Sequence, residues 1–214
     1  MSIVLIKKKK YDAVWCLPLG GYGHLADEQP LPYIHIDGLE KTPRFGGEFV
    51  TREHIPMPMG VLNSRWPVKQ RVFNLFRKRL NIYWREIFSS FTRADNNFYL
   101  YEQCSYKKTE NGFSGSSPII EFERSFSFEE KVITVNDHLI FKERLNFCSL
   151  VIGQYCAFPV SDVIIESSCE QNFELDFKSS TGSSKIIGTQ LNNVVFNPGD
   201  EIEWQIRYHL PISL

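Results

Sequence analysis

The sequence predicts a mainly β protein, an antiparallel two-sheet β-sandwich that carries one amphipathic helix. Short segments of alternating apolar and polar residues recur through the C-terminal half at spacings of roughly 8–12 residues, which is typical of sandwiches and barrels. Pro and Gly interrupt residues 40–62 too often for a helix. Hydrophobic residues make up 43% of the chain and include 17 Phe, which is enough for a packed core. We therefore expect a single domain over residues 1–214, with a helical insertion at about 65–90.

The C-terminal half supplies most of the expected strands. The expected strands are residues 119–128, 131–135, 139–147, 172–178 and 201–208, and the first and the last two of these alternate. Clean alternation indicates that one face of each strand is buried and the other is in water. Turn residues separate the segments: we expect a turn at Asn136–His138, another at Asn197–Asp200, and a loop over Thr109–Pro118.

The N-terminal region is predicted to contain short strands. Apolar runs occur at Ile3–Ile6, Ala13–Leu17 and Tyr33–Ile36, and the last of these alternates and ends at a glycine turn. Lys7–Lys10 follow the first run, so we expect them at a solvated strand end or turn. Residues 40–62 are expected to be loop or isolated edge strand.

The one helix candidate is basic. Ser64 and Pro67 fit a helix start, and apolar residues then recur at three- and four-residue spacing. The stretch from Arg65 to Arg85, here called the basic stretch, has seven Arg or Lys and no Asp or Glu. Arg binds carboxylates and sulfates bidentately, and aromatic rings stack on sugars. The stretch therefore supplies the candidate ligand-binding residues Trp66, Arg71, Arg77, Lys78, Tyr83, Trp84 and Arg85. The alternative is an amphipathic helix on the sheet, with its Lys and Arg heads in water.

Overall composition narrows the class of protein. The formal net charge is −1, which argues against a dedicated nucleic-acid binder. The five cysteines have no CxxC spacing and are odd in number, so we expect reduced thiols and a reducing compartment, the cytoplasm. The N-terminus does not follow the pattern of a secretory signal, and no segment approaches the ~18 apolar residues of a transmembrane helix.

A glycine-rich segment holds the candidate metal ligands. His24 and Asp27 lie three residues apart in the turn that starts at Gly20, and His35 follows on the next predicted strand. Two imidazoles and a carboxylate are a ligand set for Zn²⁺ with an open fourth position. In the alternative interpretation Asp27 caps the turn and the histidines have no metal. We expect no cofactor unless this site holds Zn²⁺. Alternating Glu121 and Glu123 are acid–base candidates, or simply the wet face of a strand.

Two segments carry a resemblance to a known family. The turn Gly21–Asp27, which leads into a strand ending Ile36-Asp37-Gly38, resembles the turn that opens the C-terminal β-sandwich of the heparinase II/III-like polysaccharide lyases. Phe122–Phe128 followed by Val132–Leu139 is similar to a later hairpin of that family. The resemblance implies a carbohydrate-related β-sandwich, with His24 and Asp27 as site or metal groups. Leu25 is an extra residue and Tyr22 replaces a His. The family's catalytic helical toroid has no room in this chain, so lyase activity is not implied.

These observations predict an accessory or non-catalytic β-sandwich that binds an acidic polysaccharide or another polyanion through the basic stretch. One alternative is a small metal-dependent polysaccharide lyase or hydrolase that uses His24, Asp27 and His35. The other is a structural or interaction subunit whose exposed sheet edge pairs with a second copy in a homo-oligomer.

Overall fold

The computed structural model describes residues 3–17, 33–37, 59–62, 97–99, 105–117, 119–157, 164–179 and 182–212. Every regular element in these ranges is a β-strand, and every strand pair is antiparallel. The mainly β, antiparallel prediction is therefore confirmed. No helix capable of crossing a membrane occurs in this part of the chain. The expected amphipathic helix at about 65–90 lies outside the described residues.

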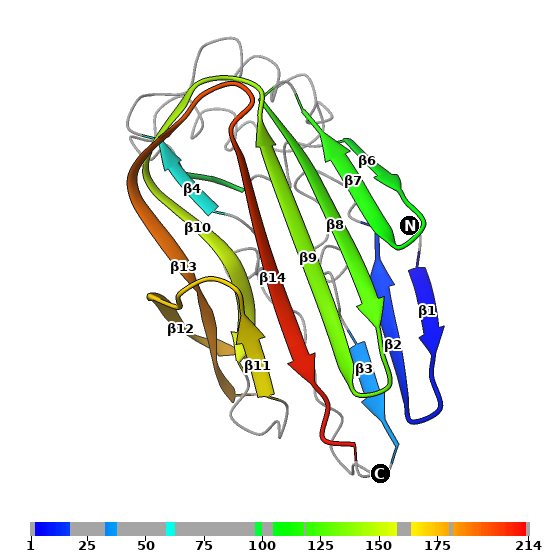
Figure 1. The fold of residues 1–214 in the computed structure, drawn as a ribbon. Coiled ribbons are helices and arrows are strands. Elements are labelled where there is room, and N and C mark those ends of the chain that lie inside the picture. Colours follow the sequence, from blue (N-terminus) through cyan, green and yellow to red (C-terminus); the bar gives the residue numbers. More distant parts are fainter. Residues whose placement is uncertain are drawn as a thin grey trace, which may run out of the picture.

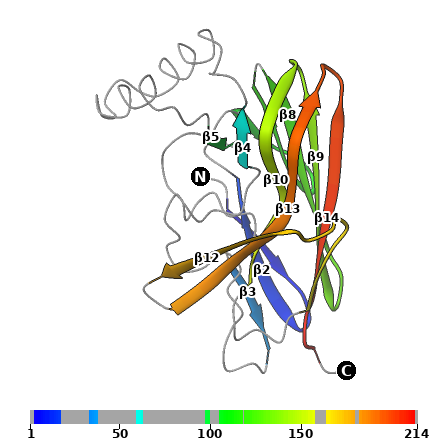
Figure 2. The ribbon, with the colours of Figure 1, turned by 90° about the vertical axis from the view of Figure 1, so that its left-hand side faces the viewer.

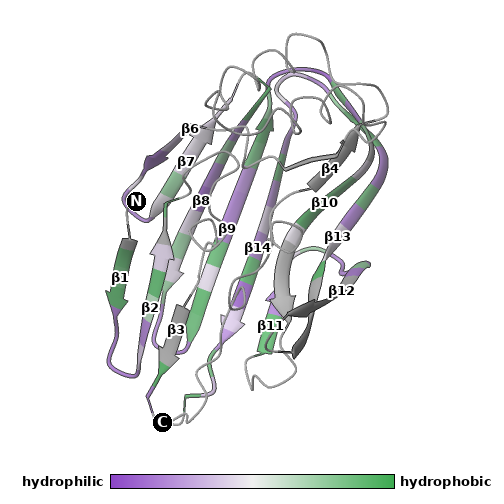
Figure 3. Ribbon diagram, turned by 180° about the vertical axis from the view of Figure 1, so that it is seen from behind, coloured by the Kyte–Doolittle hydropathy of each residue, from purple (hydrophilic) through white to green (hydrophobic). Residues whose placement is uncertain are grey.

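The largest sheet has six strands in the order β11-β14-β9-β8-β7-β6 (Figure 1). Its strands are β6 (Ser105–Lys108), β7 (Gly112–Ser116), β8 (Ile120–Phe128), β9 (Val132–Phe141), β11 (Ile164–Ser167) and β14 (Glu201–His209). Burial alternates along β8 as the sequence predicts, and Figure 3 shows apolar and polar residues succeeding one another along these strands. This period of two divides the sheet into an inner, apolar face and an outer, wet face.

Two smaller sheets lie on the inner side of the six-stranded sheet (Figure 2). One has the order β1-β2-β3, and its strands are β1 (Ile3–Lys7), β2 (Tyr11–Cys16) and β3 (Tyr33–Ile36). The other has the order β12-β13-β10-β4-β5, and its strands are β4 (Met59–Leu62), β5 (Asn97–Tyr99), β10 (Leu145–Ala157), β12 (Phe173–Ser179) and β13 (Gly182–Phe196). Because the described strands form three sheets where two were expected, the two-sheet sandwich stays a prediction.

One aromatic core joins the three sheets. Trp15 on β2 stacks on Phe126 of β8, with ring centroids 5.3 Å apart. Phe141 on β9 stacks on Phe196 of β13 at 4.1 Å. Tyr11 at the start of β2 is 1% exposed, and its hydroxyl donates a 2.6 Å hydrogen bond to the carbonyl of Glu129. Side chains that are far apart in sequence thus hold the small sheets against the large one.

Two sequence predictions about turns are wrong, and one is confirmed. Asn136–His138 does not turn: β9 runs straight through these residues. Within the expected loop at Thr109–Pro118, residues 112–116 form strand β7. The turn at Asn197–Asp200 is present, because Gly199 adopts a positive φ of 90° and the Asp200 amide donates to the Asn197 carbonyl. Lys7 ends β1 and Lys8–Lys10 lead into β2, as expected for a solvated strand end.

Candidate functional site

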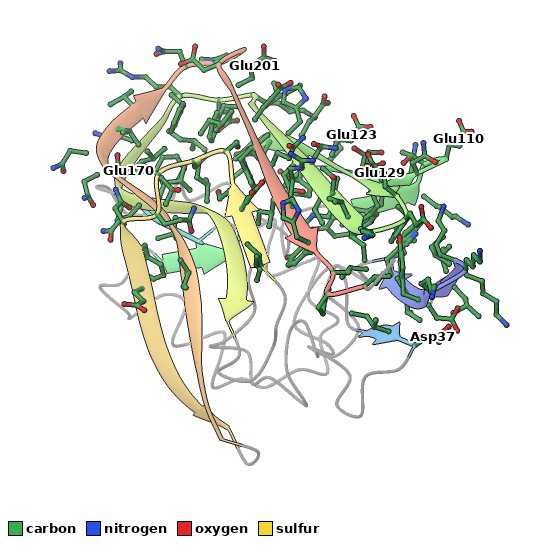
Figure 4. The ribbon with its side chains drawn as sticks, turned by 60° about the horizontal axis from the view of Figure 1, so that its bottom comes forward. Asp37, Glu110, Glu123, Glu129, Glu170 and Glu201 are labelled. Carbon is green, nitrogen blue, oxygen red and sulfur yellow. The ribbon has the colours of Figure 1, made fainter. Side chains whose placement is uncertain are left out.

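A groove of about 530 Å³ lies on the outer face of the six-stranded sheet. Strand alternation places side chains of β8, β9 and β14 on this face, and the register aligns them in two rows across the strands. The carboxylate row is Glu123, His138 and Glu203. The amide row is Ser125, Asn136 and Gln205. Figure 4 shows Glu123 and Glu201, at the start of β14, pointing away from the sheet. The groove therefore exposes carboxylates, an imidazole, amides and a hydroxyl on one surface.

The carboxylate row gives the groove a negative charge. His138 Nε2 lies 3.0 Å from Glu201 Oε2 and 3.9 Å from Glu203 Oε1. Within the described ranges, Glu123 makes no ion pair. Three carboxylates thus surround one imidazole, and a polyanion would meet repulsion at this surface.

The amide row is fixed by hydrogen bonds to its neighbours. Gln205 Nε2 donates to Asn136 Oδ1 over 2.7 Å. The backbone N–H of Gln205 donates to Ser168 Oγ over 2.8 Å, and the Ser168 N–H donates back to the Gln205 carbonyl over 2.9 Å. These bonds use the oxygen of Asn136 and one donor of Gln205, so the Asn136 Nδ2 and the Gln205 Oε1 can still bond a ligand.

A buried ion pair lies on the opposite side of the same strands. Arg124 on β8 and Asp137 on β9 are register partners, and two guanidinium nitrogens donate to the two carboxylate oxygens. Their side chains are 4% and 1% exposed. Burial raises the pKa of the Asp137 carboxyl, while Arg124 and the Trp204 side chain oppose the shift by favouring the charged form. The pair ties β8 to β9 directly beneath the groove.

A second hollow of about 280 Å³ extends the surface toward β6. It shares Glu123 and His138 with the first groove, so the two form one band across five adjacent strands. At this end Lys142 pairs with Glu121 at 2.7 Å and donates to Ser116 Oγ at 2.8 Å. The band has carboxylates on β8 and β14, the His138 imidazole on β9 and the Lys107 ammonium on β6.

The sequence-predicted site residues fall mostly outside the described ranges. His24, Asp27 and all seven ligand-binding candidates of the basic stretch lie there. His35 lies on β3, where its backbone is paired with Asp12 of β2. Among the described residues, no group of three or more His, Cys, Asp or Glu could hold a metal ion. The zinc site therefore stays a prediction.

Glu121 and Glu123 lie on the outer face of β8, as the wet-face interpretation requires. His138, Asn136 and Gln205 were not expected as site residues. His138 and Asn136 were expected in a turn, and Gln205 lies 69 residues from Asn136. No local motif could therefore have found the groove.

Comparisons with known proteins add little. No protein-family model and no curated protein matches the chain. Among solved structures, the chain is similar to 4-alpha-glucanotransferase from Thermococcus litoralis, with a TM-score of 0.41 and 11% sequence identity. The similarity covers 97% of this chain and 37% of that protein. At this TM-score the likeness supports no inference about fold or function.

Proposed function

We propose that the chain is an accessory, non-catalytic carbohydrate-related β-sandwich that binds an acidic polysaccharide through the basic stretch. The observation that carries the proposal is the segregation of charge along the chain. The basic stretch has seven cations and no carboxylate, whereas the groove on the six-stranded sheet is lined by carboxylates. A polyanion that avoids the groove is drawn to the basic stretch. There Arg side chains offer bidentate contacts to carboxylate or sulfate, and aromatic rings offer stacking surfaces.

The proposal is tested by retention on heparin and alginate resins. Arg71, Lys78 and Arg85 are replaced together by Ala, which removes three of the seven cations. The matched control removes three exposed lysines elsewhere, Lys7, Lys8 and Lys9. We expect the first variant to elute at clearly lower salt and the control to elute with the unmodified protein. Equal elution of both variants, or no retention of the unmodified protein, would overturn the proposal.

The two rival functions give different results. About one Zn²⁺ per chain that is lost in a His24→Ala variant would support the metal-dependent lyase or hydrolase. A stable dimer in light scattering, together with no retention on either resin, would support the structural subunit.

A further inference from the structure

The groove is not used by the polyanion-binding function. Its carboxylates repel an acidic polymer. The side chains that line it nevertheless have fixed positions, because they lie on three consecutive, fully paired strands. The strand register fixes the positions of the side chains that line the groove. The Arg124–Asp137 pair joins β8 to β9 beneath them. Side chains on rigid strands hold their geometry before a ligand arrives, which lowers the entropic cost of binding.

We propose that this groove is a second ligand site, and that its ligand is a saccharide carrying a free ammonium group, an amino-sugar unit. The site is independent of the basic stretch and selects the opposite charge. It is formed by Glu123, Asn136, His138, Glu203 and Gln205.

The hydrogen-bonding groups of the amide row suit sugar hydroxyls. The Gln205–Asn136 bond leaves a donor at Asn136 Nδ2 and an acceptor at Gln205 Oε1, beside each other on adjacent strands. A hydroxyl group both donates and accepts, so neighbouring hydroxyls of one sugar ring can engage both amides. Ser125 adds a hydroxyl to the same row.

The charge of the carboxylate row selects the ammonium group. Glu123 has no ion-pair partner among the described residues, and Glu203 has only the 3.9 Å approach of His138. These two carboxylates flank His138 from adjacent strands and so face the groove from both sides. An ammonium group beside one of these carboxylates gains a charge-assisted contact to it and is attracted by the other, whereas N-acetylation removes the charge that both carboxylates attract.

The band has room for more than one sugar. It crosses five strands, β14 to β6, which at ~4.8 Å per strand spacing is roughly 19 Å. A short oligosaccharide therefore fits across the strands, with its amine-bearing unit over β8, β9 and β14.

The test is isothermal titration calorimetry of the full chain with a glucosamine trisaccharide, its fully N-acetylated form, and spermidine. We expect the glucosamine trisaccharide to bind at least about tenfold more tightly than either of the others. Glu123→Gln and Glu203→Gln each remove one charge at an exposed position, so they should weaken binding about tenfold without unfolding the protein. Asn136→Ala should weaken binding of the glucosamine trisaccharide and leave binding of spermidine unchanged.

The matched controls are Glu110→Gln, an exposed carboxylate outside the groove, and the Arg71/Lys78/Arg85 variant. Both should bind the trisaccharide as the unmodified protein does. Three results would overturn the proposal: no binding of the glucosamine trisaccharide, equal binding of its N-acetylated form, or equal binding of spermidine. Retention on heparin resin is scored separately, so failure of this site is distinguishable from failure of the proposed function.

Discussion

The buried Arg124–Asp137 pair gives the sharpest prediction about stability. Replacing Asp137 by Leu removes two charge-assisted hydrogen bonds and the carboxylate that pairs with the Arg124 guanidinium, a side chain that is only 4% exposed. Hydrogen bonds to charged groups contribute about 1.5–3 kcal/mol each, and breaking a buried pair costs about 3–5 kcal/mol. We therefore expect Asp137→Leu to lower the free energy of unfolding by about 4 kcal/mol, a large share of the 5–15 kcal/mol typical of folded domains.

The assay is urea unfolding followed by tryptophan fluorescence. A loss of about 4 kcal/mol lowers the urea midpoint by about 1.5 M for a chain with an m-value of about 2.5 kcal/mol/M. The double variant Arg124→Met/Asp137→Leu removes both charges of the pair together. Its stability should return to within about 1–2 kcal/mol of the unmodified protein. The pair does not stabilise the fold in this way if Asp137→Leu costs less than about 1 kcal/mol, or if the two single losses simply add in the double variant.

The free energy of unfolding of the single Arg124→Met variant should depend on pH. Burial already raises the pKa of the Asp137 carboxyl, and the loss of Arg124 removes the first of the interactions that oppose the shift. The folded state then binds the proton more tightly than the unfolded state. Stability is therefore greatest below about pH 4, where unfolded Asp titrates, and falls as pH rises toward the folded pKa. Unfolding at pH 5 and pH 8 measures this, and a variant that is more stable at pH 8 would contradict it.

Two further predictions concern other elements. A Cβ at Gly112 would lie 1.9 Å from the Arg124 carbonyl oxygen, so Gly112→Ala should lower the free energy of unfolding in urea by about 2–4 kcal/mol. The control Ser114→Ala on the same strand should lower it by under about 1 kcal/mol. Similar losses in the two variants would contradict a steric clash at Gly112. Burial, together with the Glu129 charge, raises the pKa of Tyr11 to about 12 from 10.0, so the folded state keeps a proton that the unfolded state loses. Stability should fall by up to about 2.7 kcal/mol as pH rises from 10 to 12, and Tyr11→Phe should abolish that part of the fall; an unchanged alkaline slope in the variant would contradict the assignment.

The strands could be predicted from alternation because one face of the sheet is buried and the other is wet. β8 and β14 follow that rule and were located correctly. The rule failed where local composition is typical of turns. Asn136-Asp137-His138 reads as a turn, but Asp137 is buried against Arg124, and this compensates for a polar residue on the inner face. Gly112–Ser116 reads as a loop, yet Gly112 is what lets β7 approach the backbone of β8.

The groove could not be predicted because its two rows join the consecutive strands β8 and β9 to β14, which is far away in the sequence. Gln205 and Asn136 are 69 residues apart, and only the β9–β14 register brings them together. The ion pair beneath the groove did leave a signal. Arg124 lies two residues from Phe122 and from Phe126, so it is on the same apolar face of its strand. Asp137 lies in the same way between Val135 and Leu139, so each strand places one charge on its apolar face. Two opposite charges at inward positions of neighbouring strands indicate a buried pair.

The proposed function depends on binding of an acidic polysaccharide by the basic stretch. Its most direct test is the salt dependence of affinity for a heparin oligosaccharide, measured for the unmodified chain and for the Arg71/Lys78/Arg85→Ala variant. We predict a steep linear fall of log affinity with log salt, with a slope about 2 units shallower in the variant because three ionic contacts are lost. A slope near zero in the unmodified chain, or the same slope in both proteins, would contradict it.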